Sequence, residues 1–371
     1  MKKILLIATL VFIAVRLSAQ DDFLSPPRID DGWGTGSALK AGLNTELLLE
    51  LSNKIDSGHY KNIHSVLLIK DGKLLMEKYG GGFDRERIHS LRSISKFLTA
   101  TLLGMAIDKG HIKSSDEPVF KYLPNYQDLK TEAKNKILLK HLVTMSAGLQ
   151  WQESNVAYGT DENDETQMYR NGEWVRYTLS KPVISEPGIN FEYSGGLANV
   201  TAAVLEEALP ATGLDFAKKH LFAPLGISDI QWRTHKQHNW LNAAAGASLK
   251  PRDLAKIGQM YLNGGTWKGK RILSKEWVEQ AGSAQVGGGQ IGPFTLAYGY
   301  TALVIEKGPS FMPSLKGYAA TGNGGQILWI LPNENAVVVM TGGNYDNELS
   351  QTQPMDMMIR YIYPAMTQSG N

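Results

Sequence analysis

The stretch His89-Ser90-Leu91-Arg92-Ser93-Ile94-Ser95-Lys96-Phe97-Leu98-Thr99-Ala100-Thr101-Leu102-Leu103-Gly104-Met105-Ala106 is apolar on nearly every face from Leu91 onward. A helix of this composition is expected to lie buried in a core rather than on a surface. Ser93 and Lys96 stand three residues apart, and positions i and i+3 share one face of a helix. The stretch therefore predicts a buried helix that carries a hydroxyl and an amine side by side.

This pair has the chemistry of an activated nucleophile. An apolar site destabilises a charged lysine, so we expect a depressed pKa for Lys96 and a neutral amine that acts as a base. Ser93 would lie near the helix N-terminus, where free N–H groups favour a developing negative charge. Such a hydroxyl is a nucleophile that needs no histidine. The alternative is a helix-capping serine beside a lysine that extends to solvent, and the S-x-x-K spacing alone leaves both open.

Composition bounds the function classes. The chain has 371 residues, of which 43% are hydrophobic and 20% charged, enough for one large domain or two interleaved ones. A net charge of +2 offers no argument for binding nucleic acid. The absence of cysteine excludes disulfides, thiol catalysis and zinc–cysteine sites.

Residues 1–19 have the pattern of a signal peptide. Lys2 and Lys3 form a charged start, residues 4–15 an apolar run, and Leu17-Ser18-Ala19 a cleavage site. An uncleaved anchor is the alternative, but the apolar run is shorter than the roughly 20 residues that a membrane span needs. We therefore expect a periplasmic or secreted protein, with no membrane span after the signal is removed.

Strand signals lie near both ends of the chain and helix signals in the middle. Asp71-Gly72 between residues 65–70 and 73–79 is a strong hairpin signal. Further strands are expected at 298–305, 326–331 and 336–341, and helices at 43–55, 137–145, 197–208, 215–222, 254–262 and 352–364. Residues 150–192, polar and rich in aromatics, are expected to form a long loop that walls a site.

This order predicts an α/β (α+β) fold with an antiparallel sheet built from both chain ends. Residues 20–92 and 243–371 would form the sheet domain, and residues 93–242 an inserted, mostly helical lobe.

Two further segments carry candidate site residues. Tyr193 follows the turn Pro187-Gly188 and is either a turn aromatic or a phenol placed to pass protons. Gly322-Asn323-Gly324-Gly325-Gln326 opens an apolar strand. Its glycines mark a turn or bulge, or a place where backbone approaches a ligand and an N–H joins that of Ser93 in an oxyanion hole.

Together these segments resemble the serine β-lactamases and penicillin-recognising hydrolases, specifically the class C β-lactamase-like branch with its esterases and aminohexanoate-oligomer hydrolases. Ser93 to Lys96 matches S-x-x-K, and Tyr193-Ser194-Gly195 resembles Y-[SA]-N. Gly322-Asn323-Gly324 falls where the family has K-T-G or H-x-G, and residues 141–149 resemble "HLLTHTSGL". The similarity covers about residues 45–365 and implies a β-lactamase/transpeptidase-like fold.

The resemblance implies a role for each matched residue. Ser93 attacks the carbonyl, Lys96 takes its proton, and Tyr193 relays that proton to the leaving group. The N–H groups of Ser93 and Gly325 hold the oxyanion, with Gln326 as the alternative second donor. Substrate contacts are expected from Gly195, Gly322, Asn323, Gly324 and Trp151. The resemblance implies neither cofactor nor metal.

Two departures from the family pattern bear on the substrate. Gly195 replaces an asparagine that contacts a substrate amide and braces the lysine, and Gly322 replaces a cationic or imidazole residue that grips a carboxylate. Losing a charge-assisted contact costs about 1.5–3 kcal/mol, so preference should move away from anionic acyl donors. Lys250 or Arg252 could restore the missing cation, which leaves this point open.

Other chemistries fit the sequence poorly. There is no G-x-S-x-G elbow, and His235 with His238 lacks the carboxylate partners of a metal site. The expected function is an exported serine hydrolase acting on ester or amide bonds of a small-molecule or peptide-like substrate. A D-alanyl-D-alanine carboxypeptidase or β-lactamase is the first alternative, and a non-catalytic ligand-binding or sensor relative is the second.

Overall fold

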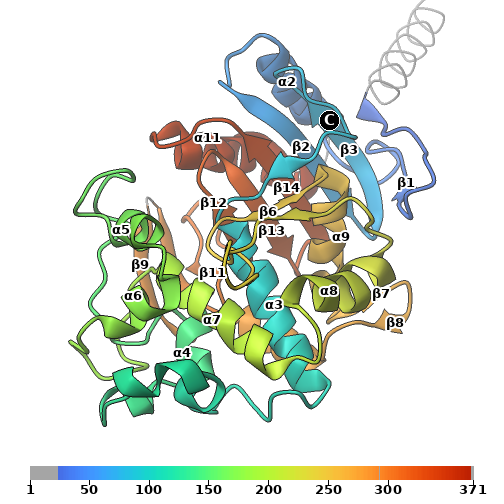
Figure 1. The fold of residues 1–371 in the computed structure, drawn as a ribbon. Helices are drawn as coiled ribbons and strands as arrows, with labels where there is room; N and C mark the ends of the chain where they lie inside the picture. The colour runs from blue at the N-terminus through green and yellow to red at the C-terminus, as the bar shows by residue number, and fades with distance from the viewer. Residues whose placement is uncertain (1–23, 292, 369–371) are drawn as a thin grey trace, which may run out of the picture.

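A central, mostly antiparallel sheet organises the protein, with β1 parallel to β3 as the exception. The computed structural model describes residues 24–291 and 293–368, and within them nine strands form this sheet in the order β1-β3-β2-β14-β13-β12-β11-β10-β9. The strands are β1 Gly34–Thr35, β2 Ile63–Lys70, β3 Lys73–Tyr79, β9 Val286–Ile291, β10 Phe294–Tyr298, β11 Leu303–Lys307, β12 Gly317–Gly322, β13 Gln326–Leu331 and β14 Ala336–Gly342. Because β2 pairs with β14, the two ends of the chain meet in one sheet, and the predicted fold class is confirmed (Figure 1).

Local sequence accounts for the central strands. Asp71 and Gly72 both have positive φ, at 50° and 72°, as the tight β2–β3 hairpin requires. In β13 the side chains of Leu328 and Ile330 enter one core, while those of Ile327, Trp329 and Leu331 enter the other. The strand is apolar throughout because both of its faces are covered.

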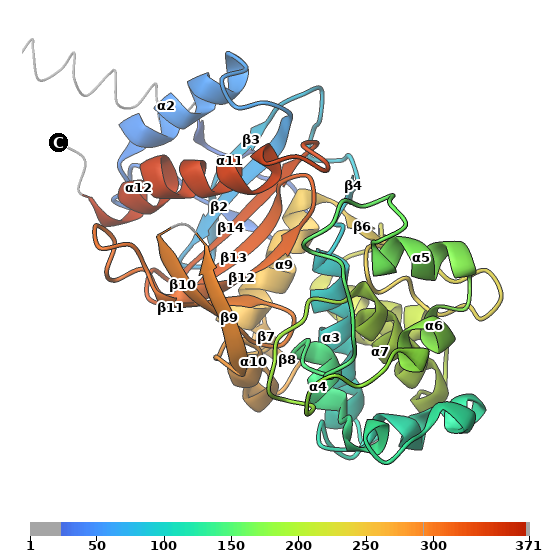
Figure 2. The same ribbon diagram turned by 90° about the vertical axis from the view of Figure 1, so that its left-hand side faces the viewer.

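Helices cover both faces of the sheet (Figure 2). On one face lie α2 Thr45–Asp56, α11 Leu349–Met357 and α12 Tyr363–Thr367; on the other lie α3 Ile94–Asp108, α9 Pro251–Leu262 and α10 Lys275–Ala281. No helix in the described part of the chain is long and apolar enough to cross a membrane. The expected signal peptide lies outside the described residues.

A helical lobe packs on α3 away from the sheet (Figure 2). It contains α4 Leu139–Val143, α5 Asp164–Asn171, α6 Trp174–Ser180, α7 Gly195–Ala208 and α8 Gly213–Ala217. Short 3₁₀ segments span Val119–Tyr122, Pro124–Leu129, Lys134–Lys136 and Ala223–Leu225, and π-helical turns span Lys218–Phe222 and Met358–Ile362. The small strands are β4 His89–Ser90, β5 Gln231–Trp232, β6 Ala247–Leu249, β7 Thr266–Trp267 and β8 Lys270–Arg271.

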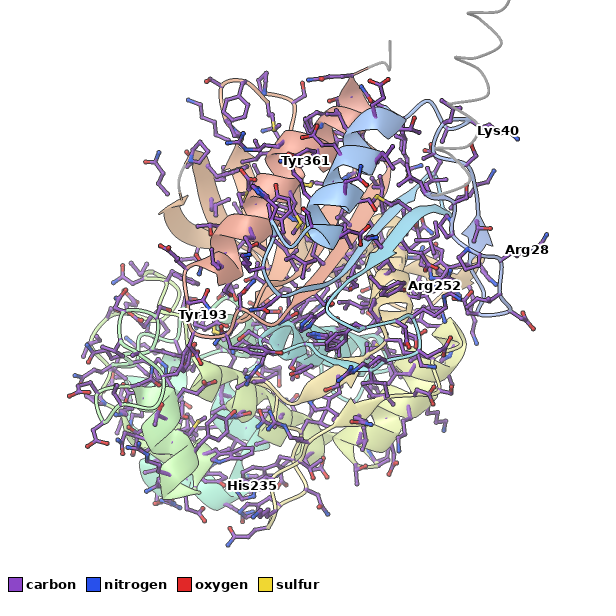
Figure 3. The ribbon with its side chains drawn as sticks, turned by 90° about the horizontal axis from the view of Figure 1, so that it is seen from above. Arg28, Lys40, Tyr193, His235, Arg252 and Tyr361 are labelled. Carbon is purple, nitrogen blue, oxygen red and sulfur yellow. The ribbon has the colours of Figure 1, made fainter. Side chains whose placement is uncertain are left out.

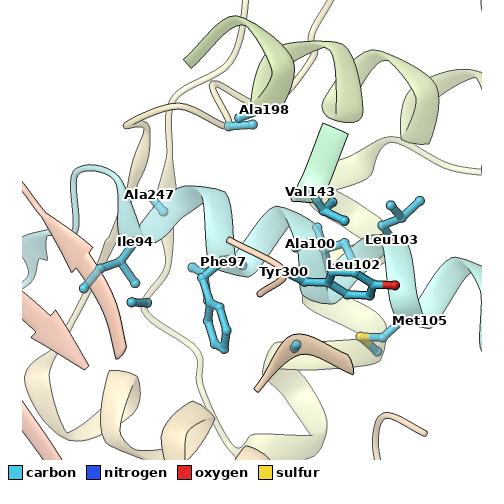
Figure 4. Close-up of a cluster of buried hydrophobic side chains, with 14 of the residues drawn as sticks. Ile94, Phe97, Ala100, Leu102, Leu103, Met105, Val143, Ala198, Ala247 and Tyr300 are labelled. Carbon is cyan, nitrogen blue, oxygen red and sulfur yellow. The ribbon is translucent and has the colours of Figure 1, made fainter. Parts of the chain in front are cut away.

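Helix α3 lies between the lobe and the sheet. Every residue from Ile94 to Ala106 is buried, as its composition predicts, and Figure 4 shows its side chains among Val143, Ala198 and Tyr300. Full burial of each large apolar side chain contributes about 1.5–3 kcal/mol. Since α3 packs against both parts, the predicted domain boundaries at residues 92 and 242 stay a prediction.

Two sequence-based expectations were wrong. Residues 298–305 are not one strand, because the chain turns between β10 and β11 at Thr301, whose φ is 54°. Residues 150–192 are not one long loop, because they contain α5 and α6. Asn163 caps α5 by accepting a hydrogen bond from the Thr166 N–H, and Gly172 ends it with a φ of 84°. Neither helix was predicted, because the 150–192 segment as a whole is polar and both helices are short.

Candidate active site

A strand–turn–helix corner presents Ser93. The Leu91 N–H donates to the Ala247 carbonyl at 2.9 Å, and Arg92 then turns the chain with a φ of 50°. A non-glycine residue in this region costs of order 1–3 kcal/mol. The Ser95 hydroxyl holds the turn, because it donates to the Arg92 carbonyl at 2.6 Å and accepts from the Ala247 N–H at 2.9 Å. Ser93 is left partly exposed at the start of α3.

Lys96 lies directly behind Ser93. Its side chain is 2% exposed, and Nζ donates to Ser93 Oγ at 3.2 Å and to the Ala244 carbonyl at 2.9 Å. The Ser93 hydroxyl makes no capping hydrogen bond. The alternative of a capping serine beside a solvent-exposed lysine is therefore excluded.

Tyr193 completes the cluster. Its ring centroid lies 4.8 Å from Lys96 Nζ, and its phenol is within hydrogen-bonding reach of Ser93 and Lys96. In Figure 3 Tyr193 lies at the border between the sheet half and the helical half of the molecule. Burial raises the pKa of Tyr193, while the Lys96 charge lowers it, with a net rise. The phenol is thus protonated at neutral pH and can donate a proton to a leaving group.

The expected depressed pKa of Lys96 is wrong. Burial lowers the pKa of Lys96, but the negative charges of Tyr193, Glu153 and Glu165 outweigh that effect and raise it. At neutral pH Tyr193 and most of Glu165 are protonated, so the charge of Glu153 is the one that favours the Lys96 ammonium there. The sequence argument failed because it counted the apolar neighbours on the helix and not the acids brought by other elements.

Two glutamates of the 150–192 segment reach this cluster, and sequence reasoning missed both. Glu153 is 1% exposed and accepts hydrogen bonds from the Gly195 N–H at 2.7 Å and from Trp151 Nε1 at 2.8 Å. Burial, with the nearby Glu153, raises the pKa of Glu165 to about 8. Their presence among aromatics was the only sequence signal, because no fixed spacing relates them to Ser93.

Asn199 on α7 also escaped the sequence analysis. It is 1% exposed, and its Oδ1 accepts from the N–H groups of Ala243 at 3.0 Å and Ala244 at 3.3 Å. These bonds fix the segment that precedes the Ala244 carbonyl, which accepts from Lys96. Asn199 therefore positions the lysine through the backbone of another segment.

Comparison with known proteins identifies the family. The sequence model described as Beta-lactamase matches residues 64–357 of the chain. The chain belongs to the β-lactamase family. The expected resemblance is confirmed, and the protein is a serine hydrolase of this fold, which sets aside the non-catalytic alternative.

Individual relatives agree with this placement. The chain is similar to the 6-aminohexanoate-dimer hydrolase of Paenarthrobacter ureafaciens, with 26% identity over 297 residues, which is 74% of this chain and 70% of the relative. The fold is similar to that of an octameric penicillin-binding protein homologue from Pyrococcus abyssi, with TM-score 0.66, 19% identity, and coverage of 88% of this chain and 77% of the other. It is also similar to EstCE1, a hydrolase with promiscuous acyltransferase activity, with TM-score 0.67, 17% identity, and coverage of 87% and 99%.

In this β-lactamase-family hydrolase the β12–β13 hairpin lies beside the Ser93 corner. A Cβ added to Gly322 would fall 2.5 Å from the Leu91 carbonyl oxygen and 3.2 Å from Arg92 Cβ. A side chain at position 322 therefore cannot fit unless the turn at Arg92 moves. The Asn323 side chain pairs instead with Asp346, donating at 2.6 Å, and its contact with substrate stays a prediction.

The second oxyanion donor also stays a prediction. A Cβ built on Gly325 would lie 3.6 Å from Cγ of Pro354 on α11. The side-chain direction of Gly325 therefore faces α11. The Gln326 side chain donates to the carbonyls of Asn323 and Gly342 and shapes the hairpin. Gly324, held through its N–H by Ser350 Oγ at 2.8 Å, is likewise part of the hairpin frame.

Trp151 contacts the Ser93 cluster through Glu153, and His235 lies away from it. Trp151 is 6% exposed and packs in a small cluster with Met168 and Trp174, so its contact with substrate stays a prediction. His235 Nε2 donates to the Gly172 carbonyl oxygen at 2.7 Å within the helical lobe, and Figure 3 shows His235 far from Tyr193. Its position is that of a packing residue.

The two candidate replacement cations have other partners. Lys250 Nζ pairs with Glu86 at 2.8 Å and Asp229 at 2.7 Å. Arg252 is 3% exposed and pairs with Glu77 at 2.6 Å and Asp31 at 3.0 Å. Both are engaged in ion pairs that tie surface segments to α9, and neither restores the cation missing at position 322.

Proposed function

We propose that the protein is an exported serine hydrolase that cleaves ester or amide bonds of small acyl substrates through an acyl-serine intermediate. The observation that carries the proposal is the 3.2 Å contact between Ser93 Oγ and the buried Lys96 Nζ, with Tyr193 beside them. Relatives named as a 6-aminohexanoate-dimer hydrolase and a lovastatin esterase support amide and ester chemistry. Export rests on the pattern of residues 1–19.

The proposed reaction has two steps. Ser93 Oγ bonds to the carbonyl carbon and its proton moves to a neutral Lys96. As the bond from that carbon to the leaving alcohol or amine breaks, Tyr193 protonates the leaving group and takes a proton back from Lys96. Water then attacks the acyl carbon, and Ser93 regains a proton. The Ser93 N–H at the start of α3 contributes one oxyanion donor.

Because Lys96 is an ammonium in the free protein at neutral pH, only the minor neutral form can accept the proton. The raised pKa of Lys96 means that this form becomes more populated as pH rises. Acylation should therefore accelerate with pH through the neutral range, approaching tenfold per unit for one proton lost. A pH-independent rate between about pH 6 and 8 would contradict the role of Lys96 as base.

We further propose a preference for neutral acyl groups. Position 322 carries no side chain, and Lys250 and Arg252 are held in ion pairs away from Ser93. Measured kcat/KM should therefore be higher for p-nitrophenyl butyrate than for nitrocefin or D-alanyl-D-alanine peptides.

Hydrolysis of β-lactams or D-alanyl peptides is the second candidate, and one observation favours it. The Arg92 guanidinium lies 4.5 Å from the centroid of the Tyr345 ring, next to Gly322, and its buried Nε has no hydrogen-bond partner among the described residues. A substrate carboxylate could pair with this cation. A kcat/KM for nitrocefin well above that for the butyrate ester, lost in Arg92→Met, would establish this candidate over the first.

Labelling with a fluorophosphonate tests the nucleophile. The mature protein should be labelled, and Ser93→Ala should abolish labelling without changing the thermal midpoint. Ser57→Ala is the matched control, because Ser57 is an exposed serine at the end of α2, on the other face of the sheet. Equal labelling of the Ser93 variant would refute the assignment.

A further inference from the structure

The place of a side chain at position 195 is already taken. A Cβ built on Gly195 would lie 2.4 Å from Glu165 Oε1, 3.0 Å from its Cδ and 3.1 Å from its Cγ. Real Cβ atoms do not approach other atoms this closely, so a side chain at 195 would require the Glu165 carboxyl to move. The Glu165 carboxyl of α5 thus occupies the space that a side chain at position 195 of α7 would fill.

Local structure fixes the backbone from which the Glu165 side chain extends. Glu165 stands in the first turn of α5, whose start is fixed by the Asn163 cap and by Asp164, which accepts from the Gln152 N–H at 2.7 Å. Gly195 opens α7, and its N–H donates to Glu153 at 2.7 Å. The starts of both helices are thus anchored, which places the Glu165 carboxyl against Gly195.

We propose that Glu165 is a positioning residue of the active site, whose carboxyl supplies the polar group that Gly195 lacks. This inference rests on the proposed function of Ser93 and Lys96. It adds Glu165, from the 150–192 segment, to the groups that determine the pKa of Lys96.

The surroundings of Glu165 support a neutral carboxyl in this role. The charged and titratable groups that act on it or feel its charge are Glu153, Lys96, Arg92, Tyr158 and Tyr169. Burial and Glu153 raise the pKa of Glu165 to about 8, against the opposing effect of Lys96 and Arg92. A protonated carboxyl presents one donor and one acceptor, the same pair that a carboxamide offers.

At pH values above its pKa, Glu165 is a carboxylate, and its charge raises the pKa of Lys96. The negative charge does so because it stabilises the Lys96 ammonium. Acylation in the wild type should therefore rise with pH more slowly above about pH 8, because the neutral amine becomes harder to form. A glutamine at 165 cannot ionise, so its rate should continue to rise.

Four variants test the proposal, with p-nitrophenyl butyrate as substrate. Glu165→Ala should lower kcat at pH 7 about tenfold, the scale expected when one hydrogen bond in the site is lost. Glu165→Gln should recover most of that loss and show no slowing above pH 8. Glu165→Ala combined with Gly195→Asn should also recover activity, because the carboxamide then comes from position 195. Glu162→Gln, an exposed neighbour in sequence, is the control.

Two outcomes would overturn the proposal. One is a Glu165→Ala protein with wild-type kcat and pH profile. The other is a Glu165→Gln protein as impaired as Glu165→Ala, which would mean that a fixed negative charge, such as one that binds a cationic substrate, is what the site needs.

The exclusion between positions 165 and 195 has a readout that does not need activity. Gly195→Asn should lower the thermal midpoint of the wild type more than that of the Glu165→Ala protein. An equal fall in the thermal midpoint in the wild type and in the Glu165→Ala protein would refute the claim that the two side chains compete for one space. A wild type that hydrolyses no ester and takes no fluorophosphonate label would instead refute the proposed function, so the two failures are distinguishable.

Discussion

Asn199→Ala should damage both stability and catalysis, because one buried amide fixes the segment that holds Lys96. The substitution leaves the N–H groups of Ala243 and Ala244 without their acceptor, at a site where Asn199 is 1% exposed. An unsatisfied buried donor costs about 1–3 kcal/mol. Since the bond to Ala244 is long, at 3.3 Å, we expect a total loss of roughly 2–4 kcal/mol in the free energy of unfolding.

The catalytic effect of Asn199→Ala should exceed what instability explains. The Ala244 carbonyl would no longer be held at 2.9 Å from Lys96 Nζ, so kcat should fall while KM changes little. Urea denaturation and steady-state kinetics at a temperature where the variant is folded measure the two effects. Asn135→Ala, at an exposed asparagine, is the control. An Asn199→Ala protein with wild-type stability and kcat would refute the reasoning.

Two further predictions concern packing and pH. A Cβ at Gly104 would lie 2.5–2.7 Å from three Trp277 ring atoms. Gly104→Ala should therefore lower the free energy of unfolding, measured by urea denaturation, by about 1–3 kcal/mol. An unchanged midpoint would contradict this prediction, because it would show that the indole can move. Burial and His89 lower the pKa of His64 to about 4, so the unfolded chain binds a proton there at a higher pH than the folded chain does, and stability should fall progressively between about pH 6.5 and 4. His64→Gln should flatten this loss and His59→Gln, at an exposed histidine, should not; equal slopes in all three proteins would contradict the assignment.

The parts of the fold that sequence predicts are those where one local pattern has one structural solution. Asp71-Gly72 adopts the two positive φ angles that its hairpin needs, and the all-apolar face pattern of residues 94–106 is that of a buried helix. The strand expected at 298–305 failed because Thr301, at a φ of 54°, carries no sequence signal for a turn. Strands β9 and β12 were missed since their glycines are typical of loops.

The active site divides in the same way. Ser93 and Lys96 could be paired from sequence because a helix fixes their spacing, and the structure places them 3.2 Å apart. Glu153, Glu165 and Asn199 could not be, since α5, α7 and the 151–158 segment bring them together only in the folded chain. The error in the pKa of Lys96 follows from this omission, because Tyr193, Glu153 and Glu165 together raise that pKa against the effect of burial.

The location of the acyl group tests the central claim most directly. The protein is mixed with p-nitrophenyl butyrate, quenched in acid within the first turnover, and digested for peptide mass spectrometry. We predict a burst of p-nitrophenol, near one equivalent per protein when deacylation is the slower step, and a butyryl group on Ser93. A butyryl group on another residue, or turnover by Ser93→Ala at the wild-type rate, would contradict the account.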